Sequence, residues 1–183
     1  MQERKPLQRN AKAKGPPKLK ADIIESERPA LSAEKRKRLN ASLWDAALWG
    51  KNRKIRKLLE AGANVNARDH KEKTALMHAA MGRRRDTCYL LVENGANIGA
   101  KDKNGWTALM WAAYYESTDS CAFLLGRGAS INARSENGDT ALGIAEKNES
   151  KETAEYLRLY AIRKVFGMVG TENFLPIFRK CIG

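Results

Sequence analysis

Long apolar runs are absent from this sequence, and their absence argues against a membrane-spanning helix. The 183 residues contain no uninterrupted apolar stretch of about 18 residues. The first residues, Met1 to Pro6, also lack the apolar stretch of a signal peptide. We therefore expect an intracellular protein in the cytoplasm, or in the nucleus if residues 34–39 act as a basic import signal in a eukaryote.

Residues that perform catalysis or bind metals are also scarce. The sequence has two histidines, His70 and His78, and neither has a nucleophilic partner that the sequence indicates. It contains no Gly-x-x-x-x-Gly-Lys-Ser/Thr loop, no Gly-x-Ser-x-Gly motif and no Cys-x-x-Cys pair. We predict no catalytic residues, no cofactor and no metal site, and we expect His78 to be a packed helix residue.

The sequence does contain one pattern that occurs twice between residues 69 and 134. The motif Thr-Ala-Leu-Met-x-Ala-Ala starts at Thr74 and again at Thr107, and a Gly-Ala pair follows at Gly95 and Gly128. Each matched position recurs after 33 residues without an insertion. A fixed period of this length predicts repeated supersecondary units that bury their apolar faces only by stacking.

The period, the turn before an Ala-rich helix and the Gly-Ala pair after a second helix together resemble the ankyrin repeat. The family's usual Thr-Pro-Leu-His is Thr-Ala-Leu-Met here. The resemblance covers roughly residues 35–160 and implies an all-α solenoid of about four helix–turn–helix units. The expected units are residues 35–67, 68–100, 101–133 and 134–160.

The two outer units depart from the pattern in ways that suit the ends of a stack. In the first unit, residues 35–38 replace the usual turn with charge, and we expect its first helix at residues 40–49. In the last unit, Glu146 stands where the other units have alanine. Terminal repeats need one solvated face, so these charges favour capping units.

Cysteines are few, and two of the three follow the repeat. Cys88 and Cys121 are 33 residues apart, so they should occupy one position in neighbouring units. Stacked helices lie roughly 10 Å apart, whereas a disulfide needs Cα atoms within about 7 Å. We expect two free thiols in the core; Cys181 stands alone near the C-terminus.

The two ends of the chain lie outside the repeat. Residues 1–34 hold four of the five prolines and few large apolar residues, which predicts a disordered basic arm. Residues 161–183 are apolar but interrupted by Gly167, Gly170 and Pro176, which predicts two short helices. This C-terminal segment either caps the stack or docks on another protein.

The family resemblance also indicates where a partner would bind, because its ligands usually meet the turn tips and the inner, concave helices. Large aromatic residues and methionine at those positions are typical of interface anchors. The alternative is that they shield neighbouring apolar surface. By contrast, Trp44 and Trp111 fall in the helix stripe, and we expect them in the core. The predicted partner-binding residues are Trp49, Lys73, Met81, Trp106, Tyr114 and Tyr115.

Positive charge marks a second surface. The net charge is +13, and the first 38 residues carry 12 Lys and Arg against 5 Asp and Glu. The predicted basic patch on the rim and the convex side comprises Lys51, Arg53, Lys54, Arg56, Lys57, Arg83, Arg84 and Arg85. A solvated surface is the simpler interpretation, and attraction of nucleic acid, anionic lipid or an acidic protein is the other.

These observations favour a monomeric, non-enzymatic module that binds another protein as a scaffold, adaptor or regulator. Stacked helices would present the predicted partner-binding residues rigidly, so that little entropy is lost on binding. The alternative is a nucleic-acid-associated protein that uses the basic arm and the basic patch, and its affinity would fall steeply with salt.

Overall fold

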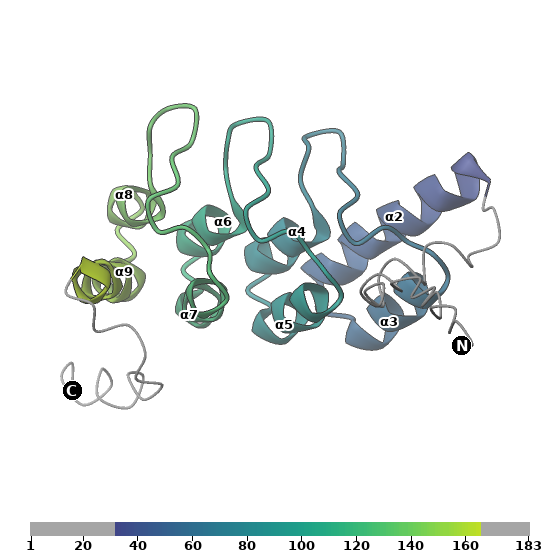
Figure 1. Ribbon diagram of the computed structural model, residues 1–183, viewed down its shortest axis with the longest axis horizontal. Helices are drawn as coiled ribbons and strands as arrows, with labels where there is room; N and C mark the ends of the chain where they lie inside the picture. Colours follow the sequence, from purple (N-terminus) through teal and green to yellow (C-terminus); the bar gives the residue numbers. More distant parts are fainter. Residues whose placement is uncertain (1–31, 166–183) are drawn as a thin grey trace, which may run out of the picture. The chain divides into compact units, whose positions relative to one another are not determined.

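The computed structural model describes residues 32–165, which form eight helices and contain no strand (Figure 1). Nearly all of the predicted basic arm and most of the predicted C-terminal segment lie outside the described residues. The helices are α2 (Ala33–Leu48), α3 (Asn52–Glu60), α4 (Ala75–Met81), α5 (Arg85–Glu93), α6 (Ala108–Tyr114), α7 (Thr118–Gly126), α8 (Ala141–Lys147) and α9 (Lys151–Val165).

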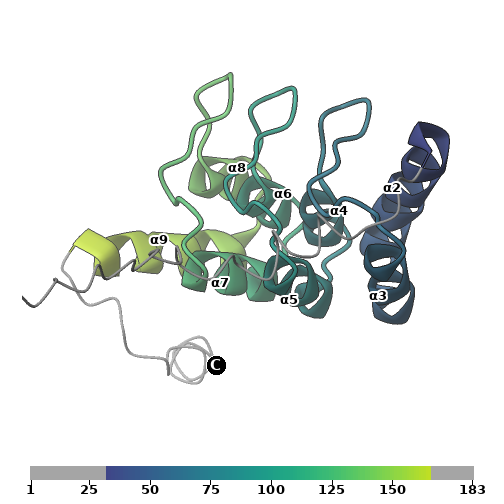
Figure 2. The same cartoon turned by 45° about the vertical axis from the view of Figure 1, so that its right-hand side comes forward.

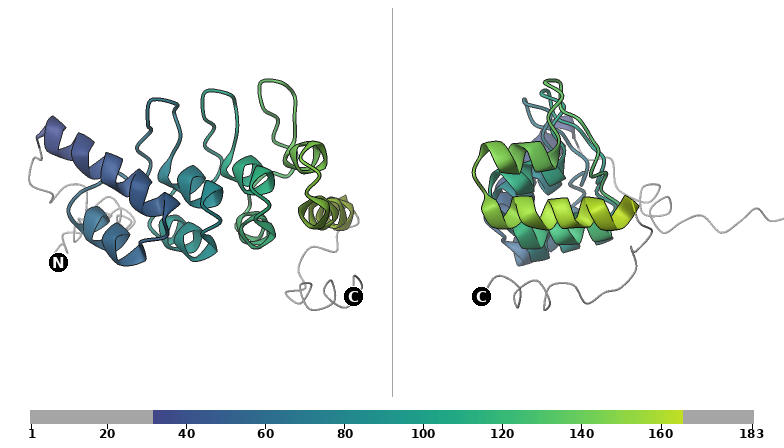
Figure 3. Two further views of the ribbon diagram at one scale, coloured as in Figure 1. Left: turned by 180° about the vertical axis from the view of Figure 1, so that it is seen from behind. Right: turned by 90° about the vertical axis from the view of Figure 1, so that its left-hand side faces the viewer.

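The helices pair in chain order, and each pair packs against the next. We call the pairs α2–α3, α4–α5, α6–α7 and α8–α9 repeats 1 to 4. The first helices stack as α2, α4, α6 and α8, and the second helices stack as α3, α5, α7 and α9. Between repeats, three long turns project side by side from the helices (Figures 2 and 3). The predicted all-α solenoid of about four units is confirmed.

A threonine begins the first helix in three of the four repeats. The side chains of Thr74, Thr107 and Thr140 accept hydrogen bonds from the backbone N–H three residues later. An oxygen at this position satisfies one of the backbone donors that a helix start leaves free, and typically stabilises it by about 1 kcal/mol. The family's usual proline is therefore not needed to start these helices.

The core runs through all four repeats along the predicted apolar stripe. Leu76 and Leu109 are buried, and small alanines beside them let successive first helices approach closely. Cys88 and Cys121 are buried free thiols, as expected. Burial raises the pKa of the Cys88 thiol to about 12, so it stays protonated and unreactive at neutral pH.

The turn within each repeat places one residue in the left-handed region. That residue is Gly50 in repeat 1, but Arg83, Glu116 and Glu149 take the same conformation with φ between 55° and 57°. The left-handed region costs a residue with a Cβ roughly 1–2 kcal/mol. Three repeats bear this cost, so stacking rather than local preference sets the turn.

Helices α2 and α9 extend beyond the predicted limits of the repeats. Residues 35–38, predicted to be a charged turn, lie inside α2, whose N-cap is Ser32. At the other end, α9 continues to Val165, so the predicted start of the C-terminal segment at residue 161 falls inside a helix. The chain has no glycine or proline from Ser32 to Trp49 or from Lys151 to Phe166, so nothing stops either helix earlier.

Candidate functional site

Four aromatic side chains from repeat 3 form one cluster. Trp106 lies on the turn before α6, and its ring centroid is 4.6 Å from Trp111 and 5.7 Å from Tyr114. Tyr115 stacks on Trp111 at 6.2 Å and meets Tyr114 edge-on at 5.1 Å. Tyr114 and Tyr115 remain 41% and 38% exposed. The cluster is therefore held together on its inner side and open on its outer side.

Two side chains from repeat 2 join this cluster. The Lys73 ammonium lies 3.9 Å from the centroid of the Trp111 ring and 3.7 Å from the Met81 sulfur. Partial burial lowers the pKa of Lys73, while the Asp102 carboxylate acts in the opposite direction. We call the six residues of this surface the aromatic surface: Lys73, Met81, Trp106, Trp111, Tyr114 and Tyr115.

Two tryptophans predicted to be core residues are only half-buried. Trp44 packs against the core, and its indole N–H donates to the backbone carbonyl of Ala67 at 3.1 Å. Trp111 also packs against the core, but its ring belongs to the aromatic surface. The Trp111 position lies two residues after the buried Leu109, or about 200° around the helix, so its ring lies at the edge of the core, next to the turn that carries Asp102.

The turns before α4 and α6 each begin with an aspartate. The aspartate before α6 fixes the arrangement of the aromatic side chains. Asp102 Oδ1 accepts the backbone N–H groups of Asn104 and Trp106, both at 2.9 Å. Its Oδ2 accepts the Trp111 indole N–H, also at 2.9 Å. One carboxylate therefore orients both tryptophans. We did not predict this role, although Asp69 and Asp102 recur 33 residues apart.

Repeat 2 has the same hydrogen-bond arrangement around an aspartate, with a histidine in place of the tryptophan. Asp69 Oδ1 accepts the N–H groups of Lys71 and Lys73, and Asp69 Oδ2 lies 3.0 Å from His78 Nε2. Burial lowers the pKa of His78, although Asp69 opposes the shift. Burial alone would raise the pKa of Asp69, but these hydrogen bonds hold it below its usual value. His78 is thus a half-buried packing residue.

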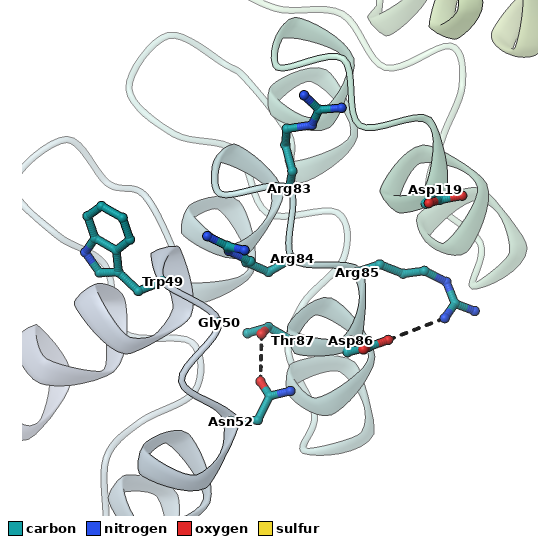
Figure 4. A pocket seen from close by; sticks show the side chains of 9 residues that line it. All are labelled: Trp49, Gly50, Asn52, Arg83, Arg84, Arg85, Asp86, Thr87 and Asp119. Carbon is teal, nitrogen blue, oxygen red and sulfur yellow. Dashed lines mark hydrogen bonds and ion pairs between the residues drawn. The ribbon is translucent and has the colours of Figure 1, made fainter.

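Trp49 lies away from the aromatic surface. It makes no ring contact with another aromatic residue in residues 32–165. Instead it lines a hollow of about 430 Å³ between repeats 1 and 2, together with Arg83, Arg84 and Arg85 (Figure 4). The structure therefore separates one predicted partner-binding residue from the other five.

The predicted basic patch is also divided. Arg83, Arg84 and Arg85 line this hollow, whereas the α3 part of the patch does not. All eight side chains are solvent-exposed. The part of the patch outside the hollow comprises Lys51, Arg53, Lys54, Arg56 and Lys57.

Within residues 32–165, four stacked pairs of helices define a helical repeat protein. The family model for ankyrin repeats (3 copies) matches residues 43–135, which is just over half of the chain. The chain therefore belongs to the ankyrin repeat family, whose members are generally protein–protein interaction modules. No curated protein matches the sequence.

Two further features concern the described part of the chain alone. Between residues 32 and 165, no helix is long and apolar enough to cross a membrane. Within the same span, no three His, Cys, Asp or Glu side chains gather in a way that could hold a metal ion.

Proposed function

We propose that this protein is a non-enzymatic interaction module that binds another protein through the aromatic surface and the neighbouring turn tips. The observation that carries the proposal is the contact between Lys73 and Trp111, which connects partly exposed side chains of two neighbouring repeats. Aromatic side chains with one buried and one open side are typical of interface hot spots.

The turns beside this surface are tied to one another. The backbone N–H of Lys103 donates to the backbone carbonyl of Lys71 at 3.2 Å. The backbone N–H of Glu136 donates to the backbone carbonyl of Asn104 at 3.0 Å. Arg68 also reaches the next turn, where it donates to the carbonyl of Lys101 at 2.7 Å. Turns held in this way lose little conformational entropy when a partner binds.

Substitution of single aromatic residues tests the proposal. Trp106→Ala and Tyr114→Ala should each weaken binding of the captured partner about 10- to 100-fold, since a hot-spot residue contributes about 2 kcal/mol or more. The partner is first captured from the native source with the wild-type chain, and its affinity for each variant is then measured by isothermal titration calorimetry. Circular dichroism of each variant should show the wild-type helical content.

Tyr89→Ala provides the matched control. Tyr89 is an exposed aromatic residue on α5 that contacts Phe123 rather than the aromatic surface. Its replacement should leave the affinity unchanged. Unchanged affinity in the Trp106 and Tyr114 variants would exclude this surface as the site, and steep loss of wild-type affinity with added salt would favour a basic surface instead.

A further inference from the structure

The hollow between repeats 1 and 2 is a second surface that the aromatic surface does not explain. It lies where the turn between α2 and α3 meets the turn between α4 and α5 (Figure 4). Its volume of about 430 Å³ is within the range of roughly 300–1,000 Å³ that is typical of ligand sites. We call it the arginine hollow; its lining includes Trp49, Asn52, Arg83, Arg84, Thr87 and Asp119.

One wall of the arginine hollow offers an apolar surface. Trp49 is 59% exposed, the largest exposed fraction among the large hydrophobic side chains of residues 32–165. Its indole N–H has no hydrogen-bond partner there, unlike those of Trp44 and Trp111. An indole with this exposed fraction and no hydrogen-bond partner for its N–H is available to an apolar side chain from outside.

Arg84 is held in place beside Trp49. Its side-chain stem lies across Gly50, where an added Cβ would come within 2.9 Å of Arg84 Cδ. Its Nε donates a long hydrogen bond of 3.4 Å to the carbonyl of Leu48. The guanidinium points towards the Trp49 side of the arginine hollow (Figure 4). This leaves its terminal N–H groups free to meet a carboxylate.

The electrostatic potential on the wall formed by Trp49, Arg83 and Arg84 is positive. Arg83 has no ion-pair partner within residues 32–165. The N-cap residues of α3 and α5, Lys51 and Arg84, contribute no side-chain capping bond. Uncapped helix starts add partial positive charge, which favours a bound anion.

The opposite wall carries negative charge and limits where an anion can bind. It is formed by Asp86, which pairs with Arg85 at 3.5 Å, and by Asp119 at the start of α7. An anionic group is therefore favoured beside Arg83 and Arg84 and disfavoured at the other wall. A long polyanion would meet both walls, whereas a short acidic segment would not.

The turn itself does not require arginine. The residues equivalent to Arg83 and Arg84 are Glu116 and Ser117 in repeat 3, and they are glutamate and serine again in repeat 4. Glu116 adopts φ 55° where Arg83 adopts φ 56°, so the two side chains fit one backbone. The backbone conformation of this turn therefore does not by itself select arginine at these positions.

We propose that the arginine hollow binds a short acidic peptide segment of another protein. One carboxylate of that segment meets the Arg84 guanidinium, Arg83 adds positive charge to the same wall, and a neighbouring apolar side chain covers Trp49. Carboxylate–guanidinium hydrogen bonds are among the stronger polar contacts, and they are directional enough to select this wall.

A labelled peptide tests this assignment with the full chain. The probe is fluorescein-labelled Gly-Glu-Asp-Phe-Glu-Asp-Gly, and its binding is measured by fluorescence polarisation at low salt. The double variant Arg83→Glu/Arg84→Ser places the residues of repeats 3 and 4 in repeat 2, so it should leave the fold unchanged. The double variant should weaken peptide binding at least tenfold. Trp49→Asn introduces the residue found at the equivalent position of repeat 4, and it should weaken peptide binding at least threefold.

Arg53→Glu is the matched control for charge, because Arg53 is exposed on α3 and does not line the arginine hollow. It should leave binding within twofold of wild type. Trp106→Ala should also leave it unchanged, which separates this proposal from the proposed function of the aromatic surface.

Four results would overturn the proposal. These are no binding of the peptide to the wild-type chain, equal loss in Arg53→Glu and the double variant, and equal binding of a peptide with the acids replaced by glutamine. The fourth is that a single-stranded oligonucleotide binds more tightly than the peptide and loses affinity in the double variant, which would assign the arginine hollow to nucleic acid.

Discussion

Repeats 2 and 3 share one scaffold but present different surfaces. Both have a threonine N-cap, a buried leucine two residues later and an aspartate that accepts two backbone N–H groups of the turn. Where repeat 2 has lysine, histidine, methionine and glycine, repeat 3 has four aromatic residues. The substituted pairs are Lys73/Trp106, His78/Trp111, Met81/Tyr114 and Gly82/Tyr115.

The difference separates the positions that build the stack from those that are free to vary. The shared positions are buried or bonded to the backbone, and the four differing positions all lie at least partly exposed. They lie on the turn before the first helix, within that helix and at its C-terminal end. The proposed partner-binding positions are therefore those at which the two repeats differ, and the following predictions test that division.

The largest effect is expected at a shared position. Leu76→Ala and Leu109→Ala each remove a buried side chain from the same place in the stack, so each should lower the free energy of unfolding by about 2–5 kcal/mol. Urea unfolding followed by circular dichroism measures both. Volume-conserving substitutions in a core usually cost less than about 1.5 kcal/mol. If the losses in the two variants differ by more than that, the two leucines do not have equivalent roles in the stack.

A smaller effect is expected at a position where the repeats differ. A Cβ at Gly82 would lie 2.0 Å from the carbonyl oxygen of Leu48, so Gly82→Ala should cost about 1–3 kcal/mol of stability through overpacking. At the equivalent place in repeat 3, Tyr115→Ala removes only ring contacts and should cost about 1 kcal/mol. Thermal unfolding of both variants compares them, and equal losses would contradict the difference in packing.

The smallest effect concerns pH and the pair Asp69–His78. Because burial lowers the pKa of folded His78, the unfolded chain takes up a proton first as the pH falls through about 6.5. This contribution to stability is therefore present above that pH and is lost as the pH falls below it. His78→Trp, which copies Trp111, should flatten the dependence of the urea-unfolding free energy on pH below about 6.5. A slope identical to that of wild type would show that His78 is not its source.

The scaffold was predictable because its positions obey a fixed period. Leu76 and Leu109 were placed in the core, and Cys88 and Cys121 were assigned as free buried thiols, since a position that recurs after 33 residues must have the same neighbours in each repeat. The limits of α2 and α9 were not predictable in the same way. Each belongs to a terminal repeat, where the period no longer constrains where the helix stops.

The candidate site was only partly predictable. The sequence indicated which positions face outward, so Lys73, Met81 and Trp106 were among the expected residues. It did not show that Trp111 belongs with them, because a tryptophan on an apolar helix suits the core equally well. Nor did it separate Trp49 from the others, although that residue lies beside Arg84 and not beside an aromatic ring.

The sequence by itself determined the repeat, the fold class and the buried stripe, because each follows from a period that one chain repeats along its length. Only the tertiary structure decided which exposed side chains meet. Lys73 of repeat 2 contacts Trp111 of repeat 3, and Trp49 and Arg84 both line the arginine hollow. Such contacts depend on the direction in which each side chain leaves its helix or turn, and stacking sets that direction.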